Sequence, residues 1–377
     1  MTNSLEAAPG SPRHARDLVV GVDIGGSKIA VLVVDGNLDI RGRLVVPTPV
    51  GSPTTAAAHI VETISAALET AGASIERVSA VGVGVPGRVD PQAGVVSLAV
   101  NLGWHRLPLR EQLEGRLGVP CAIENDVRAA AAGIRDRRLL GEVEDFIYLS
   151  VGTGISAGVV LAGLLHRGTR GLAGEVGHVV VDADGPLCSC GLRGCLETLA
   201  SGPAIARLAG DAIRAGRPSS LATRPTITAI DVHAAAVAGD SLAAEIVAAG
   251  GRALARAIHG LVMTYDVQRV IVGGGVAGAG RPFLASIETE LDAIRASSEL
   301  AAEMLERGIV ELLPDGSDTG AWGAITVATS ISLGRNGQPH DGFIGRRSAA
   351  LAAGRSTSEA SDATERAKEV VARDALT

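Results

Sequence analysis

The chain has 377 residues, 46% of them hydrophobic and 20% charged, which is enough for about two globular domains. It carries 34 basic and 41 acidic residues, a formal net charge of −7, and no cluster of Lys or Arg that would indicate a nucleic-acid-binding face. The first 17 residues lack the apolar run of a signal peptide, and four cysteines do not form the framework of a secreted disulfide protein. We therefore expect a soluble cytoplasmic protein without nucleic-acid or membrane partners.

Apolar β-rich runs alternate with segments of helical periodicity, which is typical of an α/β protein. We expect strands at 18–24, 29–34, 40–46, 78–85, 119–123, 145–151, 155–162 and 268–273. We expect helices at 54–72, 108–117, 126–134, 203–214, 230–237, 240–265, 281–295 and 320–332. Residues 1–17 and 335–377 lack a sustained apolar period and are expected to be mostly disordered tails, with a frayed helix at 361–375 as an alternative.

The segment from Phe146 to Leu165 is uncharged for 20 residues, the length that spans a bilayer. A glycine-rich turn at 152–154 divides it, however, and no basic cluster flanks it, so a pair of strands is favoured over a membrane span. A similar hairpin is expected near residue 25, and an α/β segment follows each of the two. This long-range echo predicts two similar halves around a cleft.

Two matches to G-x-G-x-x-G, which begin at Gly82 and Gly273, are weak evidence for dinucleotide binding in a chain with 49 glycines. The first is followed by a turn and not by a helix N-terminus, so a pyrophosphate would have no helix to sit on. A P-loop is excluded because the chain has no Gly-Lys pair.

The loop at residues 23–28 (Asp-Ile-Gly-Gly-Ser-Lys) is more informative. Its glycines let backbone N–H groups approach an anion, its serine adds a hydroxyl donor, and Lys28 is one of only two lysines in the chain. Asp23 is a candidate ligand for a hydrated Mg²⁺. A tight hairpin with a surface lysine is the alternative, but residues 152–154 offer similar donors, so the two hairpins together could clamp a polyphosphate. The candidate phosphate-binding residues are Asp23, Gly25, Gly26, Ser27, Lys28, Gly152, Thr153 and Gly154.

A metal site is predicted from His178, Cys188, Cys190 and Cys195, which lie within 18 residues. Four soft or borderline ligands, with glycines between them to bend the chain, suit a tetrahedral Zn²⁺. All four positions would be filled by protein, so this zinc would be structural. A redox pair or a chance grouping of cysteines is the alternative, and Cys121, in an apolar strand, is interpreted as a core thiol.

Together these motifs resemble those of the ROK family of sugar kinases and repressors. Residues 23–28 look like its first phosphate loop, and residues 124–126 (Glu-Asn-Asp) resemble its catalytic segment. Residues 175–178 match E-x-G-H, and residues 188–197 match the highly specific C-x-C-G-x-x-G-C-x-E. The resemblance covers about residues 18–333. Ser27 stands where members often have Thr, and Arg128 stands where many have Asn.

The resemblance implies an actin-like fold of two α/β domains, with ATP and sugar bound in the cleft between them. We expect a small domain at 18–125, joined by a returning helix at 318–333, and a large domain at 126–317. The short polar segment before the first strand favours a kinase over a repressor with a helix-turn-helix. We also expect a homodimer or a homotetramer.

The resemblance further implies transfer of the γ-phosphate of ATP to the 6-hydroxyl of a hexose, with glucose favoured. Fructose, N-acetylmannosamine or another amino sugar, and a sugar-sensing regulator without catalysis, are alternatives. Asp126 is expected to be the general base, with a plain helix N-cap as its alternative role. Trp104 is expected to be a core aromatic or a stacking residue. The expected sugar-binding residues are Asn101, Asn125, Asp126, Glu175, His178 and Glu197, and a tight turn without Cβ atoms is expected beside the adenosine at Gly273, Gly274 and Gly275.

Overall fold

The computed structural model describes residues 16–49, 53–314 and 316–332, all of which belong to one compact unit. The expected C-terminal tail, with its alternative helix at 361–375, lies outside these residues, and so does the expected N-terminal tail except for Arg16 and Asp17.

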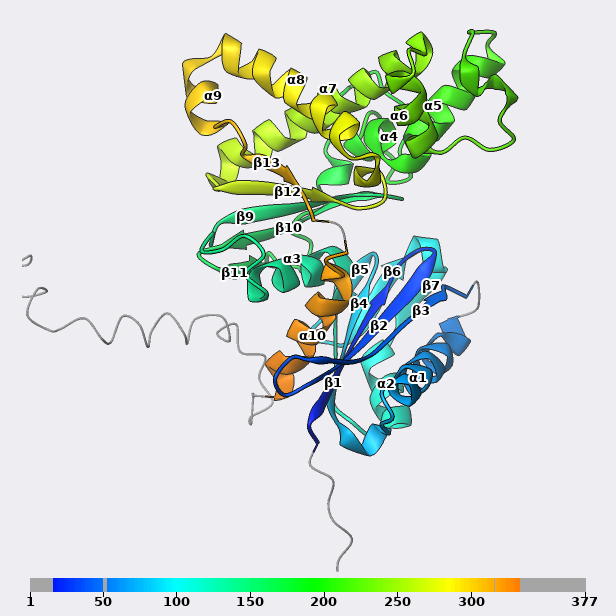
Figure 1. Cartoon of the computed structure of the whole chain (residues 1–377), viewed down its shortest axis with the longest axis vertical. Coiled ribbons are helices and arrows are strands. Elements are labelled where there is room, and N and C mark those ends of the chain that lie inside the picture. Colours follow the sequence, from blue (N-terminus) through cyan, green and yellow to red (C-terminus); the bar gives the residue numbers. More distant parts are fainter. Residues whose placement is uncertain (1–15, 50–52, 315, 333–377) are drawn as a thin grey trace, which may run out of the picture. The chain divides into compact units, whose positions relative to one another are not determined.

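The first sheet has five strands in the order β3-β2-β1-β4-β8. The pairs β1–β2 and β2–β3 are antiparallel, whereas β1–β4 and β4–β8 are parallel. Helices α1 and α2 cover one face and α10 covers the other (Figure 1), so β1, β2 and β4 are apolar on both faces, whereas edge strand β3 is largely exposed. The bounds are β1 Leu18–Ile24, β2 Lys28–Asp35, β3 Ile40–Pro47, β4 Val78–Val85, β8 Cys121–Asn125, α1 Pro53–Thr70, α2 Leu109–Leu117 and α10 Thr319–Ser332.

The second sheet repeats this plan, in the order β11-β10-β9-β12-β13. Its first three strands are again antiparallel neighbours, and β12 again pairs in parallel with β9 and β13. The predicted internal echo is therefore present in the strand order. The bounds are β9 Phe146–Val151, β10 Ile155–Leu161, β11 Leu164–His166, β12 Arg269–Gly273 and β13 Val310–Leu312.

The uncharged segment at 146–165 forms the β9–β10 hairpin, as favoured over a membrane span. Among the described helices, one is long and apolar enough to cross a membrane by length and composition, namely α7. Half of its most apolar stretch is buried, and it packs against α8, α6 and α4, which fits a core helix. The helices of this core are α4 Leu196–Ala200, α5 Gly202–Arg214, α6 Ala229–Val237, α7 Ser241–Tyr265, α8 Arg281–Ser297 and α9 Glu299–Met304.

A third, three-stranded sheet was not expected from the sequence. Its strands are β5 Arg88–Asp90, β6 Val95–Ala99 and β7 Trp104–Leu107, too short to show a period of their own. Gly87, which precedes it, has φ +91°, and a Cβ there would lie 2.3 Å from the Leu98 carbonyl oxygen. The expected strand at 119–123 also begins later, at Cys121, and continues to Asn125. The short helical turns are η1 Ile75–Arg77, η2 Val100–Leu102, η3 Val176–His178, η4 Ser220–Thr223 and η5 Ala277–Ala279.

Helix α3 (Asp126–Asp136) packs against α10, against β4 and β8 of the first sheet, and against β9 and β10 of the second. The α3–α10 contact is close enough that a Cβ on Gly323 would lie 1.9 Å from the Ala129 carbonyl oxygen. A Cβ on Gly82 of β4 would likewise lie 1.9 Å from the carbonyl oxygen of Ala324 on α10. Because α3 contacts both sheets, the domain boundary expected at 125/126 stays a prediction.

The close approach of α3 and α10 makes Gly323→Ala a test of this packing. The added Cβ meets backbone atoms, which cannot rotate away, so we expect a loss of about 1–3 kcal/mol or more in the free energy of unfolding. Gly115→Ala is the matched control, because Gly115 is also helical and a Cβ there meets nothing within 4 Å. The control is expected to be neutral or stabilising by up to about 1 kcal/mol. Urea denaturation of both variants measures the difference, and equal stabilities would contradict the packing.

Candidate active site

The carboxyl ends of the parallel strands β1, β4 and β8 bring the first candidate residues together. Asp23 on β1 pairs with Gly84 on β4, which pairs in turn with Glu124 on β8. A Cβ on Gly84 would lie 3.5 Å from Asp23 Oδ1 and 3.5 Å from the Cα of Asp126. The expected magnesium ligand and the expected base therefore flank one glycine at the strand ends, where open α/β sheets bind ligands.

Both carboxyl groups are perturbed by their surroundings. Burial, followed by the charge of Asp126, raises the pKa of Asp23 to about 7, although Lys28 opposes the rise. Burial also raises the pKa of Asp126 to about 6; backbone N–H groups and Arg128 oppose this rise, and Glu175 adds to it. A carboxyl group with a pKa near neutrality is suited to accept a proton in a general-base step.

The helix that begins at Asp126 is capped by Asn125 and not by Asp126. Asn125 Oδ1 accepts a hydrogen bond from the backbone N–H of Arg128 at 3.0 Å. Asn125 Nδ2 donates to the Gly87 carbonyl oxygen at 3.1 Å and to Asp126 Oδ1 at 3.0 Å. The alternative role of Asp126 as an N-cap is therefore wrong, and the Asn125 amide orients the Asp126 carboxylate.

The predicted first phosphate loop is the turn between β1 and β2. Gly25 N donates to the Lys28 carbonyl oxygen at 2.8 Å, which closes the turn. Thr48 also holds the turn. Its Oγ1 donates to the Gly25 carbonyl oxygen at 2.7 Å, and its backbone N–H donates to the Ser27 carbonyl oxygen at 3.0 Å. Gly26, Ser27 and Lys28 are exposed, so the hydroxyl and ammonium groups are accessible to an anion.

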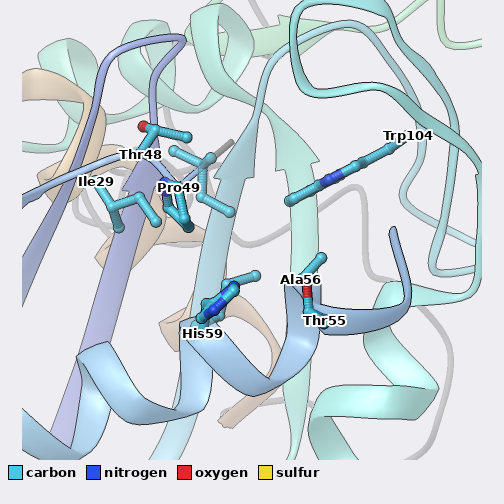
Figure 2. Close-up of a pocket in the computed structure, with 9 residues that line it drawn as sticks. Ile29, Thr48, Pro49, Thr55, Ala56, His59 and Trp104 are labelled. Carbon is cyan, nitrogen blue, oxygen red and sulfur yellow. The ribbon is translucent and has the colours of Figure 1, made fainter. Parts of the chain in front are cut away.

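A small pocket lies on the side of this loop that Thr48 supports. Figure 2 shows Thr48, Pro49 and Ile29 on one side of it and His59, Ala56 and Trp104 around the rest. Trp104 is 7% exposed and belongs to the core of the first sheet, which fits the expectation of a core aromatic. The residues that line this pocket do not include the perturbed carboxylates.

The second hairpin turn, at 152–154, faces the first. A Cβ on Gly26 would lie 4.0 Å from Thr153 Oγ1, and one on Gly152 would lie 3.5 Å from Gly275 N. Three glycine loops, at 25–28, 152–154 and 273–275, are therefore neighbours. Their backbone N–H groups supply several donors for a polyphosphate.

Three consecutive glycines, Gly273 to Gly275, stand at the end of β12, and a different neighbour restricts each of the first two positions. A Cβ on Gly273 would lie 2.8 Å from the Tyr148 ring, and one on Gly274, whose φ is +90°, would lie 2.5 Å from the Val151 carbonyl oxygen. Gly275 is exposed and a Cβ there meets nothing within 4 Å. The expected clash of a Cβ at 273 and 274 is therefore with the protein itself, and only Gly275 leaves open space for a ligand.

Three further residues expected to bind the sugar, Glu175, Glu197 and Asn101, lie at three separate elements. Glu175 precedes η3 and is close enough to raise the pKa of Asp126. Glu197, in the first turn of α4, has Oε2 3.0 Å from the Ile155 N–H, so this oxygen also holds the second phosphate loop. Asn101 is exposed on η2, and no described hydrogen bond joins it to the other candidates.

The metal-ligand prediction has a clear geometric counterpart. The ligand atoms of His178, Cys188, Cys190 and Cys195 all lie within 4.8 Å of one another. Cys188 Sγ is 3.6 Å from His178 Nδ1, and Cys190 Sγ is 3.6 Å from Cys195 Sγ. A tetrahedral zinc with Zn–S bonds of about 2.3 Å requires edges of about 3.8 Å, whereas a disulfide requires about 2.05 Å. The four residues therefore fit one zinc ion, and Nε2 of His178 is left for another partner.

Two side chains near these residues were missed as candidates. Tyr148 is buried, and burial together with the nearby charges of Asp23 and Asp126 raises the pKa of its hydroxyl. Thr48, described above, holds the first phosphate loop. Neither carries a sequence signal, because a tyrosine in an apolar strand and a threonine in a loop are common in any fold.

Residues 19–330 match the model of the ROK family. The chain belongs to the ROK family. It is 37% identical over 272 residues to a glucokinase of Streptomyces coelicolor, which covers 70% of this chain and 83% of that protein. It is 35% identical over 269 residues to an N-acetylmannosamine kinase of Citrobacter koseri, which covers 71% of this chain and 86% of that protein.

Among solved structures, the chain is similar to the ROK glucokinase of Streptomyces griseus in complex with glucose and AMPPNP. The TM-score is 0.68 and the identity 32%, over 83% of this chain and 99% of that one. The predicted family and the predicted actin-like fold are confirmed.

The zinc site predicts the behaviour of two cysteine variants. Cys190→Ala removes an exposed ligand and is expected to lower the zinc content to near zero. Cys121→Ala is the control, because Cys121 is buried in the first sheet away from the cluster, and it should keep one zinc per chain. Elemental analysis of the purified proteins measures both. A zinc-free wild type, or an unchanged zinc content in Cys190→Ala, would contradict the site.

Proposed function

We propose that this chain is an ATP-dependent glucokinase that transfers the γ-phosphate of ATP to the 6-hydroxyl of glucose. The observation that carries the proposal is the position of Asp126, a carboxylate with a raised pKa that lies across Gly84 from Asp23, two residues before the first glycine loop. Its glucokinase relatives, over most of their length, support the same activity.

In this proposal Asp126 accepts the proton of the sugar hydroxyl as that oxygen attacks the γ-phosphate. The loops at 25–28 and 152–154 bind the phosphates through N–H groups, Ser27, Thr153 and the ammonium group of Lys28, and 273–275 lies beside the adenosine. Asp23 would hold Mg²⁺, which neutralises phosphate charge when bound. A cation held there would also relieve the repulsion between Asp23 and Asp126 that contributes to the raised pKa of Asp23.

The sugar would be held by Asn101, Asn125, Glu175, His178 and Glu197. The carboxylates would accept hydrogen bonds from sugar hydroxyls, and the amides could both accept and donate them. The structural zinc would fix His178 through Nδ1, so that Nε2 could face a sugar hydroxyl. The N-acetylmannosamine kinase relative at 35% identity favours an amino sugar as the second candidate substrate. We also propose a cytoplasmic homodimer or homotetramer.

The substrate is tested by coupled ADP release with glucose, fructose, mannose and N-acetylmannosamine. We expect the highest kcat/KM with glucose. A higher value for N-acetylmannosamine would select the second candidate, and sugar binding without turnover of any hexose would favour a sugar-sensing regulator.

The base is tested by Asp126→Asn. The amide still accepts hydrogen bonds but cannot take a proton at neutral pH, so turnover should be abolished while sugar affinity stays within about tenfold. Asp136→Asn, at the exposed end of the same helix, is the control and should keep wild-type turnover. Steady-state kinetics and calorimetric sugar titration measure the two effects. Near-normal turnover in Asp126→Asn would remove Asp126 from this role.

The raised pKa of Asp126 predicts the acid limb of the pH profile. Because the base must be ionised to accept a proton, kcat/KM for the sugar should fall about tenfold per pH unit below about 6. Circular dichroism at each pH establishes that the protein stays folded over the range. A limb centred near 3.8, the ordinary value for Asp, would show that burial does not perturb this carboxyl.

A further inference from the structure

The guanidinium group of Arg128 lies inside the protein, two residues after Asp126. Its side chain is 3% exposed, Nε donates to Glu124 Oε1 at 2.9 Å, and Nη1 donates to the Gly171 carbonyl oxygen at 2.6 Å. Nη2 is buried without a hydrogen-bond partner among the described residues. A buried arginine is costly unless its bonds are well made, so these two contacts fix where the group can lie.

Glu124, at the end of β8, forms ion pairs with both Arg128 and Arg167. Its carboxylate is 1% exposed and accepts from Arg128 through Oε1 and from Arg167 through Oε2, the latter at 2.7 Å. Burial alone would raise the pKa of Glu124, but the two guanidinium groups lower it, so the group stays ionised. Helix α3 and strand β8 thus hold two points of one loop, at residues 167 and 171.

That loop runs from Arg167 to Gly174 and leads directly into Glu175. Its far end is fixed by the Gly174 carbonyl oxygen, which accepts from the Ala157 N–H on β10 at 2.7 Å. A Cβ on Gly171 would lie 3.6 Å from the Val89 carbonyl oxygen, so the middle of the loop also lies against β5 of the third sheet. In the middle of this loop, the Gly171 carbonyl oxygen accepts a hydrogen bond from the Arg128 side chain.

We propose that Arg128 is a positioning residue that sets the affinity for the sugar, because it ties the helix that carries Asp126 to the loop that places Glu175. The proposal rests on the proposed function, in which Asp126 and Glu175 contact the same sugar. Arg128 itself need not touch the substrate. It acts through the Gly171 carbonyl and through Glu124.

Lysine cannot replace arginine in this role. The guanidinium is a planar fork that directs Nε to Glu124 and Nη1 to Gly171 at the same time, whereas an ammonium is a single point of charge on a flexible stem. Arg128→Lys therefore keeps the charge beside Glu124 and loses the tie to the loop. Arg128→Met keeps the length of the side chain and loses both contacts.

The test compares these variants with Arg138→Met, which removes an exposed arginine from the turn just after the same helix. We expect Arg128→Lys and Arg128→Met to raise the KM for glucose about tenfold to a hundredfold, since small misplacements of binding groups have large effects. The KM for ATP should stay within about threefold in both variants, and so should kcat at saturating glucose in Arg128→Lys, which keeps the positive charge that opposes the raised pKa of Asp126. Arg167→Met, which removes only the more exposed tie, should raise the KM for glucose less.

Amide hydrogen exchange of residues 167–175 gives a readout that does not depend on activity. Exchange should accelerate there in Arg128→Met and Arg128→Lys and stay unchanged in Arg138→Met. An unchanged KM for glucose in both Arg128 variants, or equal rises in both KM values with a lowered melting temperature, would overturn the proposal. If the wild type phosphorylates no hexose, the proposed function fails, and unchanged exchange in the loop would then separately overturn the role of Arg128.

Discussion

The close contact of α10 with its neighbours is the constraint on which the site depends. Helix α10 lies against β1 and β4 on one side and α3 on another, at distances that leave no room for a Cβ at Gly82 or Gly323. The same closeness recurs at its first turn, where a Cβ on Gly320 would lie 2.1 Å from Asp23 Oδ2. Because α3 begins at Asp126, the helix that crowds Asp23 also sets the position of the strand-end carboxylate opposite it.

The repeated sheet order explains why two equivalent glycine turns, both proposed to bind phosphate, occur in this chain. The turn between β1 and β2 and the turn between β9 and β10 occupy the same place in their sheets, each between the first two strands of the repeat. Two equivalent turns that face each other supply donors from two directions. The turn between β9 and β10 is also fixed by Glu197 and Gly202, which follow Cys195, so the proposed zinc-binding segment adjoins a proposed phosphate-binding turn.

Much of this arrangement was predictable from local patterns. Strands such as β1 and β9 are buried on both faces and therefore show continuous apolar runs, and the glycine turns interrupt those runs clearly. The zinc ligands lie within 18 residues, so their spacing alone is informative. The family motifs then marked Asp126, Glu175 and Glu197, none of which composition could distinguish from other acidic residues.

What was missed depends on contacts between residues far apart in the sequence. The strands of the third sheet are three to five residues long and exist because they pair with one another. Glu197 accepts a hydrogen bond from the N–H of Ile155, 42 residues away, and this partner could not be predicted from sequence spacing. Arg128 stood out only as a departure from the family pattern, and its bond to Gly171, 43 residues away, gives that departure a physical meaning.

The scarcity of lysine gives the first phosphate loop a distinct chemistry. Of the two lysines in the chain, Lys28 is the one within the described residues, and it is exposed at the end of the turn between β1 and β2. The positive charge of the surface otherwise comes from arginine, which does not react with acylating reagents under mild conditions. Within the described part of the chain, an amine-selective label is therefore directed to a single loop, and a fluorophore attached there would report on that loop alone.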